Sequence, residues 1–517
     1  MPTLTLIDVL GIQNFVFTTN RLRHAVAGSA LVDRLPRWIE EACGSATVIF
    51  AAGGNAALRF ADGQQARSGM TRLSRLVHDQ APGLEFAAVH RDYQQGRLAP
   101  AVLAAQVELQ QEKLRRQPSV PLLGLGVTAA CVETHLPATG FARESPDAEP
   151  RPVATAVTQR ESFMAEIRDA WNLHLPDDRD AFWRDDGPLC RLRFPTEVDH
   201  LGRTRDDRSL LGVVHIDGNG IGRAIATWLQ QQAEAGTPDE ELCRRYRELS
   251  GALTALGCDA FKAVIRRICD AIRHDDGGYG MFSARRGLGF LLHRDGSGLH
   301  LPIRPLILGG DDLTFVCDGR IAIDLAAVAL RTFQQASLDP IGAIRACAGI
   351  AVARTHAPIL RVYELAEDLC AGAKRFLREE GQTGACALDW HFGFSSPTES
   401  LDELRERQYR QGNLCLTRRP YYLDGGETQR TWTWLAGVVD GFAAPPWLER
   451  RSKAKQLPDL ARQGQDAVQR SLSSWRISAP SLTLPGGLPQ NGYHGNATSL
   501  VDAVELLDLH LPLDPGA

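Results

Sequence analysis

The sequence predicts an α+β protein that contains two copies of one βαββαβ unit. The order strand, helix, hairpin, helix, strand occurs twice along the 517 residues. The first strand of each copy ends on an aspartate, Asp8 or Asp217, and the hairpin turn of each copy begins with two glycines, Gly53-Gly54 or Gly309-Gly310. This order is typical of a ferredoxin-like domain, in which we expect an antiparallel sheet with helices on one face.

The first copy begins with an apolar strand at residues 3–8. A helix is expected from about Arg21 to Cys43, kinked or divided at Pro36 because proline breaks the helical hydrogen-bond ladder. The remaining elements of this copy are a hairpin at 47–51 and 56–60, a helix near 65–80 and a strand at 85–90.

The second copy repeats this order with longer elements. It begins with a strand that ends at Asp217, followed by two helices that extend to Asp270 and by a hairpin at 304–316. After the hairpin we expect a helix at 321–335, a strand at 345–353, a helix at 358–380 with proline in its first turn, and a closing strand at 386–390.

Changes in composition divide the chain into four predicted domains. They are the first copy (1–118), a small linker domain rich in proline, aspartate and arginine (119–206), the second copy (207–395) and a mainly helical C-terminal domain (396–517). The linker domain has helical character at 160–173. A glycine-rich insertion at about 275–297, within the second copy, is expected to be a mobile loop.

An acidic turn in the second copy is the strongest functional signal. Gly309-Gly310-Asp311-Asp312 joins two apolar strands, and such a turn can simply be a hairpin, since glycine supplies positive φ and aspartate tolerates turns. Two adjacent carboxylates beside an apolar strand, however, repel each other unless a cation neutralises them. Together with Asp217 and the glycine loop at 218–222, they indicate a site for divalent metal ions and a nucleoside triphosphate.

The first copy lacks these acidic groups. Its turn reads Gly53-Gly54-Asn55-Ala56, and an asparagine followed by an alanine does not supply the anionic oxygens that Mg²⁺ prefers. We therefore expect the first copy to be catalytically silent and the second to be competent.

The bulk properties are those of an ordinary globular protein. The chain has 57 basic and 62 acidic residues, so nothing indicates a surface that coats nucleic acid. Its 11 cysteines are dispersed, without a Cys-x-x-Cys motif, which favours reduced thiols in the cytoplasm. We expect no signal peptide and no membrane association, because no apolar run approaches the roughly 20 residues of a membrane helix.

These motifs resemble the CRISPR polymerases, the large subunit of type III CRISPR effector complexes (the Cas-ten family). Residues 10–15, 20–23 and 28–31 resemble the opening of that family's first, degenerate palm domain. The segments at 217–222 and 309–312 resemble its active second palm. The positions of its core strand, its helix start and its phosphate-facing lysine correspond to 348–351, 356–358 and 373–375. The resemblance spans about residues 1–60 and 205–395, with a weaker similarity in the helical tail.

The resemblance implies a nucleotidyltransferase that joins ATP by 3′–5′ linkages, releases pyrophosphate and closes the product into a cyclic oligoadenylate for antiviral signalling. It implies Mg²⁺ or Mn²⁺ as the cofactor and ATP as the substrate. The partners it suggests are a guide-RNA effector complex with target RNA, other CRISPR subunits, or further copies of this chain.

Each expected role falls on particular residues. Asp217, Asp311 and Asp312 would hold two metal ions and carry catalysis. The nucleotide would contact Gly309, Gly310 and the backbone of the helix start, which comprises Gly218, Asn219, Gly220, Ile221 and Gly222.

Two further groups of residues are expected to bind nucleotide. Lys374 would neutralise the β- and γ-phosphates, unless it is simply an exposed surface lysine. A second nucleotide would bind to the silent copy, lined by Ser29, Gly53 and Gly54.

The sequence departs from the family pattern in two respects. Asn219 stands where the family often has a second aspartate, so its part in metal binding is in question. The chain also starts directly at the first palm, so we expect no HD-nuclease domain ahead of it. The His-Asp pairs at 78–79 and 274–275 are interpreted as surface residues, and we expect no DNase activity.

Two alternatives to the synthase stay open. A cyclic mono- or dinucleotide cyclase shares this palm and its carboxylates. A non-catalytic scaffold or RNA-sensing subunit would bind nucleotide without turnover. A template-directed polymerase is less favoured, since the sequence contains no long basic channel.

Overall fold

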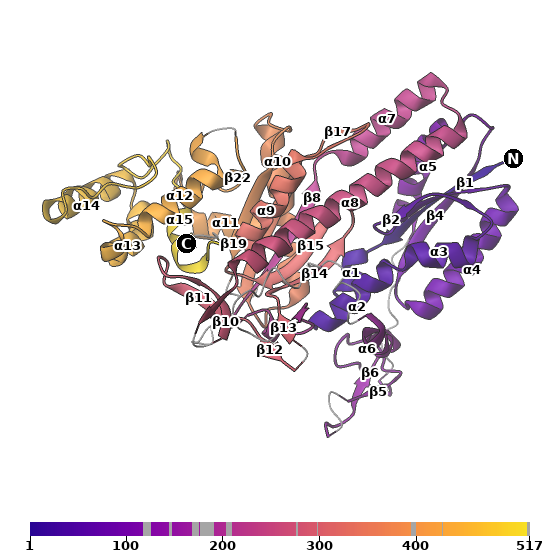
Figure 1. Cartoon of the computed structure of the whole chain (residues 1–517), viewed down its shortest axis with the longest axis horizontal. Coiled ribbons are helices and arrows are strands. Elements are labelled where there is room, and N and C mark those ends of the chain that lie inside the picture. Colours follow the sequence, from indigo (N-terminus) through magenta and orange to yellow (C-terminus); the bar gives the residue numbers. More distant parts are fainter. Residues whose placement is uncertain are drawn as a thin grey trace.

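The computed structural model describes residues 1–116, 126–143, 147–167, 175, 191–202, 209–275, 278–296, 298–393, 400–425 and 428–513. The N-terminal unit (indigo) lies beside the second unit (magenta to orange), and the C-terminal helices (yellow) lie at the opposite end of the molecule (Figure 1). Among the described residues, no helix combines the length and apolarity needed to cross a bilayer.

The first unit is a four-stranded antiparallel sheet with the strand order β2-β3-β1-β4. Pro36 lies in the first turn of a new helix, so the long helix expected there is divided in two, as predicted. The elements are β1 (Thr3–Leu10), α1 (Ile12–Val16), α2 (Leu22–Val32), α3 (Leu35–Cys43), β2 (Thr47–Ala52), β3 (Asn55–Phe60), α4 (Gly63–Gln80), β4 (Glu85–Asp92) and α5 (Leu98–Arg115).

The second unit has the same strand order, extended on one side: β14-β15-β8-β18-β19-β22. Its elements are β8 (Leu210–Gly218), α7 (Ile221–Ala235), α8 (Asp239–Ala271), β14 (Ile303–Leu308), β15 (Leu313–Asp318), α9 (Ala322–Gln335), β16 (Ser337–Leu338), β17 (Gly342–Ala343), β18 (Ala346–Arg354), α10 (Ile359–Glu379), β19 (Ala387–Phe392) and the short β22 (Tyr421–Tyr422). The predicted fold class, α+β with two ferredoxin-like units, is therefore confirmed.

The expectation that helices cover one face of each sheet is wrong, because both faces are covered. In the first sheet, Ile7 packs toward α2–α4 and Leu6 toward α5 and α8. In the second sheet, Ile216 packs toward α8 and α9, whereas Val213 packs toward α10 and α2. The continuous apolar runs of these strands explain the arrangement, because strands buried on both faces lose the alternation of polar and apolar residues.

The predicted insertion at 275–297 contains strands where we expected a loop. Its described part forms β9 (Arg273–Asp275), β10 (Gly278–Ser283), β11 (Leu288–Leu291) and β12 (Arg294–Asp295), and β13 (Gly298–His300) follows it. β13 pairs in parallel with β7 (Leu192–Arg193), which belongs to the segment before the second unit.

Much of the predicted linker domain, including 168–173 of its expected helix, lies outside the described residues. Its described elements are β5 (Gly140–Ala142), β6 (Arg151–Val153), α6 (Thr155–Ile167), β7 and the 3₁₀ helix η2 (Val198–His200). The C-terminal region contains α11 (Leu401–Tyr409), β20 (Arg410–Gln411), β21 (Leu414–Cys415), η3 (Thr428–Arg430), α12 (Trp432–Phe442), η4 (Leu448–Arg450), α13 (Arg451–Arg462), α14 (Gln465–Ser478) and α15 (Leu500–Leu509). The four domain boundaries stay predictions.

Helix α8 links the cores of the two units. It has 33 residues, which corresponds to about 50 Å of helix. Its N-terminal half, with Leu242, Tyr246 and Leu249, packs in the core around the first sheet, whereas Phe261 and Ile265 belong to the core of the second. Between these halves α8 passes the acidic turn, where a Cβ atom added to Gly257 would come within 3.0 Å of the carbonyl oxygen of Gly310.

We predict that Gly257→Ala destabilises the protein by about 1–3 kcal/mol, because the new methyl group collides with backbone that cannot move aside easily. Gly251→Ala, on the same helix, is the matched control. A Cβ atom at residue 251 meets nothing within 4 Å, so helix propensity alone should make this variant about 0.5–1 kcal/mol more stable. Urea unfolding of both variants measures the difference, and equal stabilisation by both would contradict the close approach of α8.

Candidate active site

The three predicted aspartates lie at the same end of the second sheet. Asp217 lies near the end of β8, and Asp311 and Asp312 form the turn between β14 and β15. The pairing of Leu313 with Ile216 brings Asp312 next to Asp217 across the two strands. A Cβ atom on Gly218 would lie 2.9 Å from both Cβ and Oδ2 of Asp311, so this carboxylate reaches the same strand end.

The turn that presents the acids is a tight hairpin. Leu308 pairs with Leu313, and the amide of Gly309 donates a hydrogen bond of 2.7 Å to the carbonyl oxygen of Asp312. Gly310 has φ +88°, in the left-handed region that favours glycine. Of the predicted Gly-Gly pair, the second glycine, Gly310, is thus required by the backbone of the turn.

The glycine turns of the two units touch each other. A Cβ atom added to Gly53 would lie 3.4 Å from the carbonyl oxygen of Gly309 and 3.7 Å from its Cα. Gly53 and Gly54 have φ of +59° and +81°. The turn of the first unit therefore packs backbone to backbone against the acidic turn.

Two cavities adjoin this contact and share part of their walls. The larger, of about 470 Å³, lies against α5 and α8 and is lined by Asp8, Gln106 and Ser250, among others. The smaller, of about 260 Å³, lies against α1 and α2 and is lined by Gln13, Ser29 and Asp312, among others. Both cavities include Gly53, Asn55, Gly309 and Asp311 in their linings.

The acidic turn carries excess negative charge. Burial and the neighbouring charge of Asp217 raise the pKa of Asp311 to about 6. Burial, Asp217 and Glu367 raise the pKa of Asp312 to about 7. The side chain of Asp312 still keeps 37% of its surface accessible, so a cation can reach it. Oxygen ligands that repel one another at an accessible position fit Mg²⁺ or Mn²⁺.

His215 belongs to this site, although the sequence analysis did not select it. Its Nδ1 lies 3.0 Å from Oγ1 of Thr314 and 3.5 Å from Oδ1 of Asp312. Burial lowers the pKa of His215, which favours a neutral ring beneath the acidic turn. The only signal in the sequence was a polar residue within the apolar run Val213-Val214-His215-Ile216.

Lys374 lies within the site and is not a free surface lysine. Its Nζ forms an ion pair with Oδ2 of Asp217 and donates a hydrogen bond of 2.9 Å to the carbonyl oxygen of Gly218. The side chain keeps 20% of its surface accessible. One face of α10 carries Tyr363, Glu367 and Lys374, because these residues are spaced by four and seven positions along the helix.

The first unit contains a matching ion pair that the sequence analysis missed. Lys113, near the end of α5, contacts Oδ2 of Asp8. Asp8 and Asp217 occupy equivalent strands, and α5 follows β4 as α10 follows β18, so Lys113 and Lys374 are counterparts in the repeat. The first unit thus keeps the lysine–aspartate pair and lacks the two acids of the turn.

The predicted phosphate loop forms the start of α7. Gly220 is the N-cap residue, with φ 72° and ψ 16°, and no side chain caps the helix there. Ile221 is buried, so it can offer only its backbone amide to a ligand. The open start of this 15-residue helix, which includes Gly222, is suited to anions.

Asn219 and Ser29 both make contacts within the protein. Nδ2 of Asn219 lies 3.5 Å from the carbonyl oxygen of Ala385, so its amide is directed toward β19. The buried hydroxyl of Ser29 donates to the carbonyl oxygen of Leu306, which links α2 to β14. Ser29 thus lines the smaller cavity with its hydroxyl already engaged.

His78 and His274, from the two His-Asp pairs, are exposed, as interpreted from the sequence.

No family model matches the chain, and no curated protein matches it in sequence. Solved structures do match. Csm1 in the Csm1–Csm4 cassette in complex with pppApApA has a TM-score of 0.50 and 14% identity, over 99% of this chain and 69% of the Csm1 chain. Two further structures are the same cassette in complex with cA4 (TM-score 0.43, 13% identity, 99% of this chain and 70% of the other) and Csm1 in T. onnurineus (0.44, 15%, 98% and 69%).

The identities are too low to carry residue roles from one protein to another, so they show the fold alone. The first of these matches extends over both units, the linker segment and the C-terminal helices. This chain therefore has the fold of Csm1, and the resemblance of its sequence to the large subunit of type III CRISPR effectors is confirmed at the level of the fold.

Proposed function

We propose that this protein is a nucleotidyltransferase that makes cyclic oligoadenylate, or a related cyclic oligonucleotide, from ATP. The observation that carries the proposal is the convergence of Asp217, Asp311 and Asp312 beside two cavities between the units. A purely structural hairpin gains nothing from two partly buried carboxylates whose pKa values are raised by burial and by the neighbouring Asp217. Perturbed acids of this kind in a cleft are typical of a functional site.

The three aspartates would hold Mg²⁺ or Mn²⁺. When bound, such ions neutralise the charge of a triphosphate and activate the attacking 3′-hydroxyl group. Lys374 would exchange its ion pair with Asp217 for the phosphates, and the amides at the start of α7 would receive phosphate oxygens. His215 would act as a positioning residue that holds the turn through Thr314 and Asp312.

The silent unit would bind the second nucleotide. Joining two nucleotides requires both at once in a fixed orientation, and a shared wall of glycine backbone lets two ligands approach closely. Asp8 and Lys113 neutralise each other, so this half needs no metal ion to balance its charge. It would therefore hold the nucleotide whose triphosphate does not react.

Adenine nucleotides are the first substrates to test, because the Csm1 chain of this fold was solved in complex with pppApApA. That chain forms a cassette with Csm4, so we propose that this protein also binds a second CRISPR subunit and a guide-RNA complex. A role in cytoplasmic antiviral defence belongs to the same proposal.

We predict that Asp311→Asn and Asp312→Asn each reduce product formation by about 100-fold or more, because each removes a charge that holds the metal. The assay incubates the protein with all four triphosphates and Mg²⁺, with and without a guide-RNA complex and target RNA, and identifies products by chromatography. Asp259→Asn, at an exposed position on α8, is the matched control and should keep full activity. A mono- or dinucleotide product would favour the cyclase. No wild-type product under any of these conditions would favour the scaffold.

The raised pKa values give a second prediction. In the folded protein Asp311 and Asp312 have pKa values of about 6 and 7, above the value of about 3.9 in an unfolded chain. The folded state therefore binds more protons than the unfolded state between about pH 4 and 7, and its stability falls as the pH rises through this window.

Replacing Asp312 by asparagine should therefore raise the apparent Tm in EDTA at pH 8, by about 1–4 °C, and leave it nearly unchanged at pH 4.5. Millimolar Mg²⁺ should raise the Tm of the wild type at pH 8 and that of Asp312→Asn less. The exposed control Asp402→Asn should show neither effect. A lower Tm for Asp312→Asn at pH 8 would contradict the charge repulsion.

We predict that titration with a non-hydrolysable ATP analogue in Mg²⁺ finds two nucleotides per chain. Lys374→Ala should weaken one site about tenfold and Lys113→Ala the other, because each removes one positive charge. Calorimetry gives the stoichiometry directly. A single site per chain, unaffected by Lys113→Ala, would rule out the role of the silent unit.

A further inference from the structure

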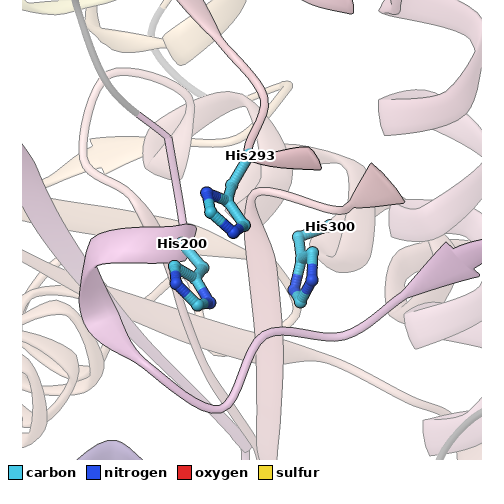
Figure 2. Close-up of side chains that lie close together, drawn as sticks. All are labelled: His200, His293 and His300. Atoms are coloured by element: carbon cyan, nitrogen blue, oxygen red, sulfur yellow. The ribbon is translucent and has the colours of Figure 1, made fainter. Parts of the chain in front are cut away.

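Three histidines outside the candidate active site gather between the linker segment and the insertion. His200 ends η2, just before the second unit, His293 precedes β12 in the insertion, and His300 ends β13, which follows the insertion. Figure 2 shows the three rings side by side on separate segments of the chain. Nothing in the proposed function uses them.

The rings are close enough to share one ligand. One nitrogen from each histidine can be chosen so that all three atoms lie within 4.8 Å of one another. The rings of His200 and His293 stack with centroids 3.7 Å apart, and the ring of His300 meets them edge-on at 5.1 and 5.0 Å. Within the described part of the chain, this is the one group of three or more histidine, cysteine or acidic side chains with such spacing.

An acidic side chain accompanies the three rings. Oδ2 of Asp295 lies 3.1 Å from Nε2 of His300 and 3.8 Å from Nε2 of His293. A carboxylate beside a histidine commonly fixes its ring and tautomer for a metal ion, or ligates the ion itself. The buried Nδ1 atom of His200 makes no hydrogen bond to any described residue, so a polar atom there is available to a ligand.

The backbone around the cluster is closely fitted. β13 pairs in parallel with β7, which brings His300 opposite Arg193 and ties the insertion to the segment that carries His200. A Cβ atom on Gly298 would come within 3.0 Å of the carbonyl oxygen of Arg191, and one on Gly202 would lie 2.6 Å from the ring of Phe290. The histidines therefore project from segments whose positions are fixed by packing.

The site itself is partly enclosed. The side chain of His300 keeps 9% of its surface accessible and that of His293 keeps 33%, so an ion could enter from one side. Burial, together with the two neighbouring imidazoles, lowers the pKa of His200 to about 4, so this ring is neutral near pH 7. Neutral imidazole is the form that binds a metal ion.

We propose that His200, His293 and His300 bind one zinc-class transition-metal ion, with Asp295 fixing His300 or completing the coordination. Ligand atoms around a tetrahedral zinc ion lie about 3.3 Å apart, given Zn–N distances of about 2.0–2.1 Å. The rings of His200 and His293 are now parallel and would have to turn about their terminal side-chain torsions, which are broad for histidine, to direct one nitrogen each at a shared ion. Three imidazoles with a carboxylate favour zinc over magnesium, which prefers oxygen ligands.

Such an ion would join two segments of the chain, each of which precedes a strand of the candidate active site. His200 lies a short distance before β8, which carries Asp217, and His293 and His300 lie before β14, which leads to Asp311. The ion would therefore hold in place the segments that lead into β8 and β14. This inference is independent of the proposed function, because the cluster shares no residue with the candidate active site.

The test measures metal content of the full chain. The protein is equilibrated with Zn²⁺ in excess Mg²⁺, which occupies the aspartate site, then desalted and analysed by mass spectrometry for bound zinc. We expect about one zinc per chain in the wild type and at least a tenfold lower content in His200→Gln, His293→Gln and His300→Gln. The matched control His356→Gln, at an exposed position, should retain the zinc.

The visible spectrum of bound Co²⁺ provides a second readout, which reports the coordination geometry as well as the amount of bound metal. Co²⁺ bound by three imidazoles in tetrahedral geometry should give strong visible absorption in the wild type, weaker in Asp295→Asn and absent in His293→Gln. Wild-type protein without bound zinc, or equal zinc in the wild type and all three histidine variants, would overturn the proposal. Circular dichroism of each variant shows whether a loss of metal reflects unfolding.

Discussion

The backbone contact between the two glycine turns is the constraint on which the rest of the site depends. Gly53 lies against Gly309, and Gly257 of α8 approaches Gly310 so closely that a side chain there would collide. Two segments therefore pack against the acidic turn. Helix α8 holds this arrangement, because its two halves belong to the cores of different units. The positions of Asp311 and Asp312 are thus set by packing between the units as much as by the hairpin that carries them.

The charged residues of the two units can be compared position by position, because the units share one strand order. The two units contain equivalent lysine–aspartate pairs, Lys113 with Asp8 and Lys374 with Asp217, and differ at the turn. The two acids at the turn of the second unit have one lysine nearby, and burial together with the charge of Asp217 raises the pKa of both. In the first unit, Asn55 and Ala56 add no charge. The two units therefore share a strand order but differ in the charge of their hairpin turns.

Much of this could be predicted from local sequence. Apolar strands that end in Asp217 or lead into Gly309-Gly310 indicated both the repeated fold and the acidic trio, because strand, turn and carboxylate are neighbours in the chain. What depended on distant segments could not be predicted. Lys113 is paired through a helix that was not assigned to the repeat, and His200 meets His293 only through the pairing of β7 with β13. The continuous apolar runs were a signal that both sheet faces are buried, but they do not reveal which helices cover each face.

The partition shared by the two cavities has a mechanical consequence. Helices α1 and α2 line one cavity and α5 and α8 the other, and Gly53, Asn55, Gly309 and Asp311 line both. Displacing this shared wall to enlarge one cavity must shrink the other. A ligand that displaced the shared wall from one cavity would therefore change the volume of the other, without any relay of side chains.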